Sequence, residues 1–419
     1  MSRYPVREPV VITGLGLITS LGSQIDTFWA ALLAGRSGVR RVSQFDPTGL
    51  PCQIAGEIRD FDPADYMQPK SARRMSRASQ ITLAASQLAV ADAGLDLQHL
   101  PSDRVGVYVG TGIGGVERLV EGIVVMRTQG ASKINPFMVP SVLPNMLAFH
   151  ICQRFGTTGP TSTITTACAT GTQVVGEASE VIRRGRADVV IAAAAESLIK
   201  DYALAGFCAM RALPMHFNDR PQQASRPFDL RREGFVFSEG AACLILESKT
   251  HAEDRGAQTY AEVAGYASSS EGFNVAQPDP SGGGALRTMT WALEDAGVAP
   301  DEVDYINAHG TSTQLNDAHE TLAIKRVFGK HAYNIPISST KSMLGHAMGA
   351  SGAIEAAVCA LSITHNEIHP TINLEAADPE CDLDYVANRS RRHEVRVALS
   401  NSFGLGGQNA CLVLRRTEA

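Results

Sequence analysis

Residues Ser162–Gly171 read STITTACATG and mark a change from strand to helix. β-Branched residues up to Thr165 favour a strand, and the stretch from Thr172 to Arg184 fits a helix. Cys168 therefore falls at a helix N-terminus, where unpaired N–H groups and the helix dipole favour a thiolate and can stabilise an oxyanion. This predicts a cysteine nucleophile, although a small buried core residue explains an isolated cysteine equally well.

Two histidines occupy comparable positions further along the chain. His309 lies in the segment NAHGTST (residues 307–313), and His346 ends the segment SSTKSMLGH (residues 338–346). Each histidine falls between a run that fits a strand and a run that fits a helix, which is where α/β folds build their sites. We therefore predict a Cys-His-His site, in which the cysteine holds an acyl group as a thioester and both imidazoles donate hydrogen bonds to an enolate.

The whole chain has the pattern of an α/β protein. Glycine-rich turns separate apolar, β-branched runs, and longer helical patterns lie between these runs. Strands are predicted at residues 10–13, 105–109, 162–165, 189–192, 242–246, 261–265, 303–307, 337–339 and 411–414. Helices are predicted at residues 80–93, 146–154, 172–184, 284–296, 317–328 and 350–365.

The order of elements is similar in two parts of the chain, residues 1–255 and residues 256–419. Each part has an opening strand, a helix that ends in Asp-Ala-Gly (residues 92–94 and 295–297), and a further strand that leads into a turn. This similarity predicts an internal duplication, which would place corresponding strand ends of the two halves face to face.

Composition limits the classes of protein that the chain can represent. Its 419 residues are 44% hydrophobic and 19% charged, with a net charge of −6, so we expect a globular protein with no general attraction to nucleic acid or to an anionic membrane. The eight cysteines are scattered without a C-x-x-C pair, which argues against a zinc site or a disulfide framework. No apolar run reaches the roughly 18 residues of a membrane span. We therefore expect a cytoplasmic protein.

Residues 110–115, GTGIGG, match the G-x-G-x-x-G pattern of a dinucleotide-binding turn. The match is weak, because no second strand that ends in an acidic residue follows at the distance needed for a ribose contact. We expect these glycines to allow close packing of the backbone around a pocket instead.

Four segments together carry a resemblance to a known family. The chain closely resembles the β-ketoacyl-acyl-carrier-protein synthases, and the type II elongating enzymes most of all, over essentially its whole length. This resemblance implies a thiolase-like fold, with two pseudo-repeated halves, mixed five-stranded sheets, α-β-α-β-α layers and a homodimer. The four segments are TACATG (166–171), NAHGTST (307–313), SSTKSMLGH (338–346) and SNSFG (400–404).

The resemblance also implies a reaction. Cys168 would take an acyl chain from the phosphopantetheine arm of an acyl carrier protein. Malonyl carrier would then lose carbon dioxide, and its enolate, held by His309 and His346, would attack the thioester and extend the chain by two carbons. The backbone N–H groups of Cys168 and Leu405 would form an oxyanion hole, and we expect Lys341 to pair with Glu320. No cofactor is implied.

Further residues acquire roles by the same resemblance. Thr311 and Thr313 match positions that bind the pantetheine arm. A metal is not required, but in some members a monovalent cation is bound near Asn307, Glu355, Ser400 and Asn401. The resemblance also implies substrate-binding roles for Ile113, Met138, Phe207 and Phe403, with Met138 at the acyl pocket. The positions for carrier docking are Arg73, Arg74, Arg77 and Arg211.

The chain departs from the family pattern beside the nucleophile. Leu405 replaces the usual aromatic residue of the gate GFGG, Met138 stands where phenylalanine is common, and Ala276 replaces a frequent threonine. A thioether adapts its shape more readily than a ring, so we expect a less stringently gated acyl pocket. A dedicated ketosynthase of a type II polyketide or polyene pathway is the alternative that this change suits.

Two other classes are disfavoured by the residues themselves. A chain-length factor normally lacks the nucleophilic cysteine, whereas Cys168 is present with both histidines. A thiolase uses an additional cysteine as general base, and neither Cys381 nor Cys411 lies in a comparable motif.

Overall fold

The computed structural model describes residues 8–418, and its centre is a ten-stranded mixed sheet. The strand order is β10-β9-β13-β14-β8-β1-β7-β6-β4-β5. The strands are β1 (Val10–Ile18), β4 (Val105–Gly110), β5 (Thr161–Ile164), β6 (Val189–Glu196), β7 (Gly240–Ser248), β8 (Ala261–Ser270), β9 (Tyr305–Asn307), β10 (Ile337–Ser338), β13 (Val397–Gly404) and β14 (Gln408–Arg415). Two short ribbons pair β2 (Arg40–Arg41) with β3 (Ile54–Ala55) and β11 (Glu367–Ile368) with β12 (Arg391–Arg392).

The sheet consists of two halves with the same topology. In the first half, β1 pairs antiparallel with β7, β7 antiparallel with β6, and β4 lies parallel between β6 and β5. In the second half, β8, β14, β13, β9 and β10 repeat the same pairings in the same order. A short antiparallel contact of Val11 and Ile12 with Glu262 and Ala261 joins the two halves. The predicted duplication is therefore present in the topology.

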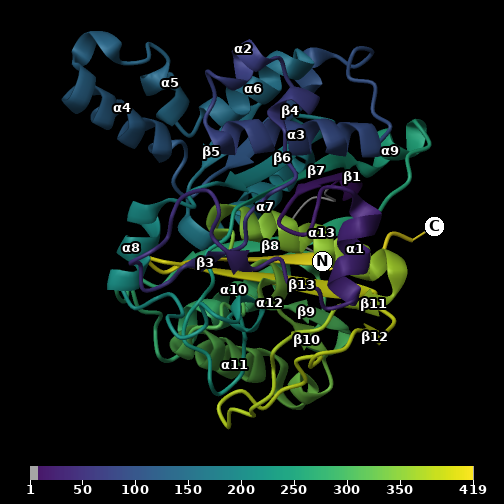
Figure 1. The fold of residues 1–419 in the computed structure, drawn as a ribbon. Helices are drawn as coiled ribbons and strands as arrows, with labels where there is room; N and C mark the ends of the chain where they lie inside the picture. The colour runs from purple at the N-terminus through teal and green to yellow at the C-terminus, as the bar shows by residue number, and fades with distance from the viewer. Residues whose placement is uncertain (1–7, 419) are drawn as a thin grey trace.

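Helices complete five layers (Figure 1). One outer layer contains α3 and α6, the central layer contains α7 and α13, and the other outer layer contains α10 and α11. The predicted α/β class and α-β-α-β-α layering are confirmed. These helices are α3 (Arg77–Asp92), α6 (Met146–Phe155), α7 (Thr170–Arg183), α10 (Gly283–Ala296), α11 (Gln314–Phe328) and α13 (Ser351–His365).

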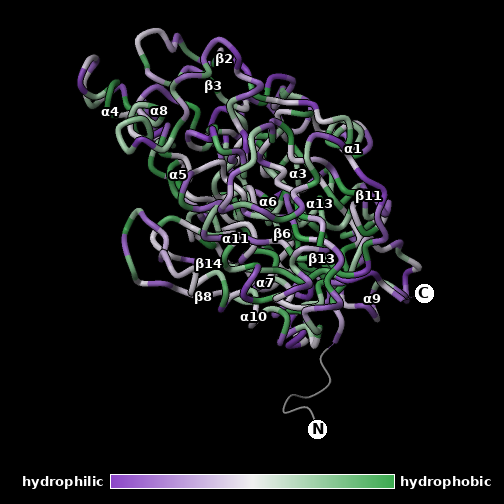
Figure 2. The backbone as a smooth tube through the Cα atoms, turned by 90° about the horizontal axis from the view of Figure 1, so that it is seen from below, coloured by the Kyte–Doolittle hydropathy of each residue, from purple (hydrophilic) through white to green (hydrophobic). Residues whose placement is uncertain are grey.

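The burial of α13 reflects its place in the central layer, between the two halves of the sheet. Every residue from Ser351 to Ile363 is buried, which is expected of a helix with neighbours on all sides. In Figure 2, segments made of hydrophobic residues lie in the interior, and α13 and β6 are among them. On the outer face, α3 approaches β1 closely because β1 carries glycine there: a Cβ at Gly16 would lie 2.0 Å from the carbonyl oxygen of Ala85. A side chain at this position would push the outer layer away.

Several elements differ from the sequence prediction. Strand β13 was not predicted, because its buried residues Ser400, Asn401 and Ser402 break the apolar pattern of a core strand. Strand β1 extends five residues past the predicted end at residue 13, to Ile18. The helices that were not predicted are α1 (Ile25–Leu33), α2 (Pro69–Ala72), α5 (Met138–Val142), α8 (Asp201–Ala209), α9 (Lys249–Asp254) and α12 (Lys341–Leu344).

An arm formed by α4 (Val116–Gln129) and α5 projects from the layered body (Figure 1). It carries exposed apolar side chains, including Val124, Met126 and Val139. The predicted boundary after residue 255 falls in the loop between α9 and β8. Its use as a domain boundary stays a prediction. Within residues 8–418, no helix is both long and apolar enough to cross a bilayer.

Candidate active site

Three segments from different parts of the chain bring the predicted triad together. Cys168 lies in a short 3-10 turn between β5 and α7, His309 follows β9, and His346 follows α12. Thr170 stabilises the turn before α7, because its hydroxyl accepts a hydrogen bond from the Thr166 N–H at 2.8 Å. Strand β5 precedes Cys168, and strand β10 precedes α12 and His346. Because β5 and β10 hold equivalent positions in the two halves of the sheet, the cysteine and His346 come from corresponding places in the fold.

The triad is compact and buried. The cysteine sulfur and one ring nitrogen of each histidine all lie within 4.8 Å of one another. Cys168 Sγ is 3.0 Å from His346 Nε2. The two imidazoles meet edge to face, with ring centroids 5.5 Å apart. The Cys168 side chain is only 6% exposed, and each histidine is 2% exposed. These three side chains form one chemical unit, as the sequence predicted.

The protonation state of the triad differs from the prediction. Burial raises the pKa of the Cys168 thiol to about 11, against the opposing effects of the Leu405 N–H and the Lys341 cation. Burial and Lys341 also hold the pKa of both His309 and His346 well below 6.5. Burial thus opposes the resting thiolate that the helix N-terminus favours, because desolvation disfavours the charged form of the thiol. The stable pair is a thiol and a neutral imidazole that share one proton.

Lys341 does not pair with Glu320, contrary to the expectation. Its ammonium group forms a buried ion pair with Glu355 of α13. Glu320 instead accepts hydrogen bonds from the backbone N–H groups of His309 and Gly310, both at 2.8 Å, and from Asn401 at 3.2 Å. Glu320 thus holds the turn that carries His309, whereas Lys341 and Glu355 join α12 to α13.

Replacement of Lys341 with methionine is expected to destabilise the fold in a pH-dependent way. Burial already raises the Glu355 pKa from 4.5 to about 7, and loss of the lysine raises it further. A carboxyl group whose pKa is higher in the folded state than in the unfolded state stabilises the protein at pH values below its unfolded-state pKa. This stabilisation is lost as the pH rises through its folded-state pKa. We expect a loss of about 3–5 kcal/mol in the free energy of unfolding at pH 8.5, and a smaller loss at pH 6.

Denaturant titration at both pH values measures this effect. Lys249→Met is the matched control, because Lys249 forms an exposed ion pair with Glu253 at 3.6 Å. This control should change the free energy of unfolding by less than about 0.5 kcal/mol. An equal loss for Lys341→Met at pH 6 and pH 8.5 would contradict the expectation.

A cavity of about 400 Å³ opens in front of the triad. Thr311 and Thr313 line it, with their hydroxyl oxygens 2.9 Å apart, and Ala276 lies on the same wall. Cys168 is the one cysteine among the lining residues that the structure describes, so a second cysteine of thiolase type is absent there. The predicted site residues that line this cavity are Cys168, Phe207, Arg211, His309, Thr311, Thr313, His346, Phe403 and Leu405.

Two predicted substrate-binding residues lie elsewhere. Ile113 is absent from the cavity lining and packs against the apolar cluster that includes Cys168. Met138 lies on the projecting arm, where its side chain packs over Gly122 of α4. Within a single chain, Met138 therefore does not reach the cavity.

Leu405 lies in the turn between β13 and β14, and its side chain is 44% exposed at the cavity mouth. Its backbone N–H lies close enough to the Cys168 sulfur to lower the pKa of the thiol, against the larger effect of burial. The two glycines that follow have φ values of +85° and +78°, which aim this turn toward the nucleophile and which other residues rarely adopt. The backbone donor is thus present without the aromatic gate.

The residues expected near a monovalent cation fit that role. Their side-chain oxygens are buried and have no hydrogen-bond partner among the described residues. Oxygen ligands of this kind suit a hard cation. The atoms are Asn307 Oδ1, Asn401 Oδ1, Glu355 Oε2 and Ser400 Oγ.

The basic cluster is only partly available to a partner. Arg73 and Arg74 are exposed, and the Arg74 guanidinium stacks over the Phe137 ring at 4.3 Å. Arg77 instead forms an ion pair with the buried Glu239 at 2.8 Å and also donates to the Ile58 carbonyl, so its charge is largely used inside the chain, and its docking role stays a prediction. Arg211 is exposed at the cavity mouth.

Sequence reasoning did not find two buried groups beside the triad. Glu196 accepts hydrogen bonds from the Gly112 N–H at 2.8 Å and from Thr111, so the glycine-rich turn holds an internal carboxylate. Burial raises the Glu196 pKa to about 7. Ser351 lies 3.0 Å from His346 Nδ1. No local signal marks either residue, because each is ordinary in its own element.

Comparison with known proteins agrees with this geometry. Residues 7–252 match the family model "Beta-ketoacyl synthase, N-terminal domain", and residues 260–375 match "Beta-ketoacyl synthase, C-terminal domain". A Synechocystis protein named 3-oxoacyl-[acyl-carrier-protein] synthase 2 is 44% identical over 412 residues, which is 98% of this chain and 99% of the relative. The protein of the same name from Coxiella burnetii is also 44% identical, over 410 residues and the same shares of both chains.

Solved structures show the same likeness. The ishigamide ketosynthase/chain length factor has a TM-score of 0.93 and 36% identity, over 99% of this chain and 100% of that chain. A β-ketoacyl synthase from Burkholderia phymatum has a TM-score of 0.91 and 38% identity, over 98% and 100%. A type II polyketide ketosynthase, solved with its acyl-carrier protein and a hexaketide, has a TM-score of 0.91 and 35% identity, over the same shares.

This chain belongs to the β-ketoacyl synthase family. The predicted class of enzyme, a condensing acyltransferase that forms β-ketoacyl thioesters, is confirmed by that membership.

Proposed function

We propose that this enzyme elongates acyl chains on an acyl carrier protein in fatty acid synthesis, with Cys168 as nucleophile and with His309 and His346 as enolate-stabilising donors. The observation that carries the proposal is the 3.0 Å contact between Cys168 Sγ and His346 Nε2, with His309 in the same buried cavity. The substrates are the acyl and malonyl thioesters of the carrier's phosphopantetheine arm.

In the first half-reaction, Cys168 attacks the acyl thioester and forms its own thioester. Transfer of the thiol proton to neutral His346 generates the nucleophile at the moment of attack. The Cys168 and Leu405 N–H groups stabilise the oxyanion of the tetrahedral intermediate. The departing pantetheine thiolate takes this proton from His346, which leaves the ring neutral for the second half-reaction.

In the second half-reaction, malonyl carrier loses carbon dioxide in the same cavity. The Nε2–H groups of His309 and His346 donate to the enolate oxygen, and the enolate carbon attacks the Cys168 thioester. The C–S bond breaks, and the released Cys168 thiolate takes one proton from solvent. Neutral imidazoles suit this task, because burial keeps the pKa of both rings low and so leaves each with a donor that adds no net charge. Thr311 and Thr313 bind the pantetheine arm at the cavity wall.

Asn307, Asn401, Ser400 and Glu355 would hold a monovalent cation through the buried oxygens that otherwise have no partner. The bound cation would supply a fixed positive charge beside the Lys341–Glu355 pair. In our proposal, the histidines and the cysteine carry out the chemistry.

We also propose the partners of the enzyme. Exposed Arg73, Arg74 and Arg211 offer a local positive surface to an acidic carrier, despite the negative net charge of the chain. The exposed apolar side chains of the α4–α5 arm support a homodimer in which this arm, with Met138, reaches the partner's acyl pocket. The eight free cysteines support a reducing, cytoplasmic location.

The test is a condensation assay with purified enzyme, acyl carrier and malonyl carrier, followed by mass spectrometry of the carrier. The expected product is a β-ketoacyl carrier two carbons longer than the acyl substrate, with release of one carbon dioxide. Failure to extend any acyl chain, with a carrier that a known elongating enzyme accepts, would overturn the proposal.

A second candidate is a dedicated polyketide or polyene ketosynthase, and Leu405 is the observation that favours it. Leu405→Phe restores an aromatic gate at a position with room for the ring, since the leucine is 44% exposed. We expect this variant to lower kcat/KM for the longest accepted acyl chain by about tenfold relative to the shortest. Chain-length profiles of the wild type and the variant measure the effect.

Leu230→Phe is the matched control, because Leu230 is 51% exposed and lies outside the cavity lining. It should leave the chain-length profile unchanged. Identical profiles for wild type and Leu405→Phe would refute a gating role for Leu405.

A further inference from the structure

A buried arginine, Arg232, holds the backbone beside the two threonines of the cavity wall. Arg232 is 1% exposed, and its guanidinium group donates from Nε to the Thr313 carbonyl at 3.0 Å and from Nη2 to the Gln314 carbonyl at 2.9 Å. The Gln314 side-chain amide donates in turn to the Arg232 carbonyl at 2.6 Å. Thr313 and Gln314 line the cavity, whereas Arg232 is not among the described residues that line it. Arg232 therefore supports the wall without being part of it.

The hydroxyl of Thr313 does not serve the helix that it begins. Thr313 is the N-cap residue of α11, and a threonine at this position commonly accepts a hydrogen bond from the first turn of the helix. Its side chain makes no such bond among the described residues, and instead its oxygen lies 2.9 Å from the Thr311 hydroxyl oxygen. Both residues line the cavity. The backbone thus places the two hydroxyls together at the cavity wall, at the cost of a helix cap.

Ser312, between the two threonines, has an uncommon backbone conformation. Its φ of +70° lies in the left-handed region, which residues other than glycine rarely adopt. Two backbone donors near Arg232 hold it there: the Arg226 N–H donates to Ser312 Oγ, and the Gly234 N–H donates to the Ser312 carbonyl, both at 3.0 Å. Residues 225–234, which we call the bracing segment, therefore support the whole turn of residues 311–314.

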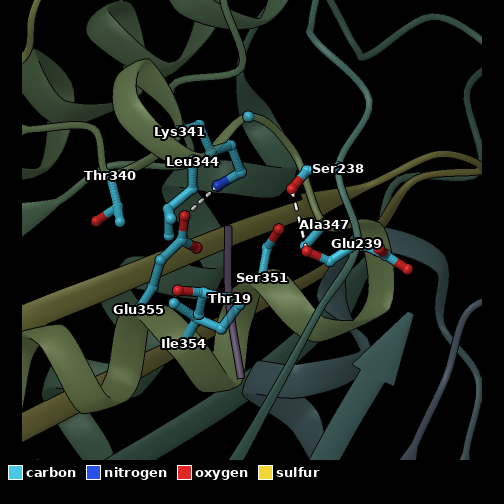
Figure 3. A pocket seen from close by; sticks show the side chains of 11 residues that line it. Thr19, Ser238, Glu239, Thr340, Lys341, Leu344, Ala347, Ser351, Ile354 and Glu355 are labelled. Atoms are coloured by element: carbon cyan, nitrogen blue, oxygen red, sulfur yellow. Dashed lines mark hydrogen bonds and ion pairs between the residues drawn. The ribbon is translucent and has the colours of Figure 1, made fainter. Parts of the chain in front are cut away.

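The bracing segment is itself fixed to the interior of the protein. At its start, the Ser225 hydroxyl donates to the Lys341 carbonyl at 2.6 Å. The Lys341 side chain forms the buried ion pair with Glu355 that Figure 3 shows. A group that is held on a rigid support can fix the geometry of a neighbouring site closely.

Two buried carboxylates balance the charge of Arg232. Its Nη1 donates to Asp378 at 2.5 Å, and its Nε lies 3.5 Å from an oxygen of Asp317. A guanidinium group presents several N–H donors in one rigid plane, so it can contact both carboxylates and both carbonyls of the turn at once. A lysine ammonium is a compact charge and cannot reproduce this planar set of contacts. The position therefore requires the shape of arginine as well as its charge.

We propose that Arg232 is a positioning residue for the pantetheine arm, because it fixes the turn of residues 311–314 so that the Thr311 and Thr313 hydroxyls face the arm. This inference rests on the proposed function, in which these hydroxyls bind the arm. Arg232 acts through the turn and does not contact the substrate. Its effect therefore concerns the binding of molecules that carry the arm, and the reactivity of Cys168 does not depend on it.

The test compares two reagents that alkylate Cys168, only one of which carries the arm. Chloroacetamide is the small reagent, and the second reagent is pantetheine with a chloroacetamide group in place of its thiol. With both reagents the sulfur displaces chloride, so a C–S bond forms, a C–Cl bond breaks, and the thiol proton leaves to solvent. Mass spectrometry of the protein over a range of reagent concentrations gives the half-saturation concentration and the limiting rate for the pantetheine reagent.

Arg232→Lys is the test variant, since it keeps a positive charge beside Asp317 and Asp378 but lacks the planar donors. We expect the half-saturation concentration of the pantetheine reagent to rise about tenfold, which is the effect of losing roughly one hydrogen bond. The limiting rate and the rate with chloroacetamide should stay within about twofold of the wild type, because neither depends on the arm. An unchanged half-saturation concentration, or equal slowing with chloroacetamide, overturns the proposal.

Arg226→Lys is the matched control. Arg226 is 3% exposed and pairs with Asp229 at 3.0 Å, but its guanidinium group makes no hydrogen bond to residues 311–314 among the described residues. Its backbone N–H, which supports Ser312, is kept in the variant. The half-saturation concentration should match that of the wild type. The same rise in Arg226→Lys and Arg232→Lys would overturn a specific role for Arg232.

Thr313→Val provides a second test, which stands even where Arg232→Lys fails to fold. Removal of this hydroxyl should also raise the half-saturation concentration of the pantetheine reagent about tenfold. Because Arg232 acts through the turn that carries the hydroxyl, the effect of the double variant should be smaller than the product of the single effects. An unchanged half-saturation concentration in Thr313→Val, or single effects that multiply in the double variant, overturns the proposal.

These outcomes are separate from the condensation assay, because alkylation needs neither carrier nor malonyl substrate. A wild type that extends acyl chains, together with an Arg232→Lys variant that binds the pantetheine reagent as the wild type does, overturns this inference alone. A wild type that extends no acyl chain overturns the proposed function, whatever the alkylation rates are.

Discussion

Replacement of Cys168 with serine is expected to lower acyl transfer on the order of 10³-fold or more, while malonyl decarboxylation persists. A serine hydroxyl is a far weaker acid than a thiol, and the neighbouring base is a poor one, since burial holds the His346 pKa well below 6.5. Decarboxylation needs only the two imidazole donors, whose positions do not depend on the sulfur. Acyl-enzyme formation by mass spectrometry and release of labelled carbon dioxide measure the two activities separately.

Cys152→Ser provides the comparison, because Cys152 is a half-buried cysteine of α6 outside the cavity lining. It should retain both activities. If Cys168→Ser still formed an acyl-enzyme at a rate near that of the wild type, the nucleophile would have to be another residue.

The architecture could be predicted largely from local patterns. The buried runs at residues 189–192 and 242–246 are apolar enough to indicate strands, and β6 and β7 contain them. The repeated Asp-Ala-Gly endings indicated the duplication. Strand β13 was not predicted, because it carries Ser400, Asn401 and Ser402 where a core strand would carry valine or leucine. Such departures from the local pattern are expected where side chains serve a site.

The grouping of Cys168, His309 and His346 in one buried cluster could also be predicted, but the charge state and ion pairs around it could not. Position in the chain indicated that Cys168 starts a helix, and the helix terminus alone predicts a thiolate. Desolvation depends on the complete fold, and in the fold it raises the thiol pKa to about 11. Likewise, no spacing rule distinguishes Glu320 from Glu355 as the partner of Lys341, because the choice depends on the packing of α12 against α13.

The glycine-rich turn illustrates the same limit. Residues 110–115 match a phosphate-binding pattern, and the backbone N–H of Gly112 does bind an anion. That anion is the side chain of Glu196, which comes from the neighbouring strand β6. A sequence pattern can thus predict that a turn offers donors, but tertiary structure decides what they bind.

Alanine substitutions of the two histidines are expected to have different effects on the two half-reactions. Each should reduce condensation about a hundredfold or more, because each removes one donor to the enolate oxygen. His346→Ala should also slow acylation, since His346 Nε2 is the group 3.0 Å from the sulfur. His309→Ala should leave acylation within a fewfold of the wild type, because no hydrogen bond joins its ring to Cys168 among the described residues.

Single-turnover acylation and steady-state condensation, measured on the same preparations, separate these effects. His216→Ala is the control, because His216 has an 82% exposed side chain outside the cavity lining and should leave both rates unchanged. Equal loss of acylation in His309→Ala and His346→Ala would mean that the two rings act on the sulfur together. The expected asymmetry follows instead from one geometric fact: His346 contacts both the nucleophile and the Ser351 hydroxyl, whereas the buried Nδ1 of His309 has no partner among the described residues.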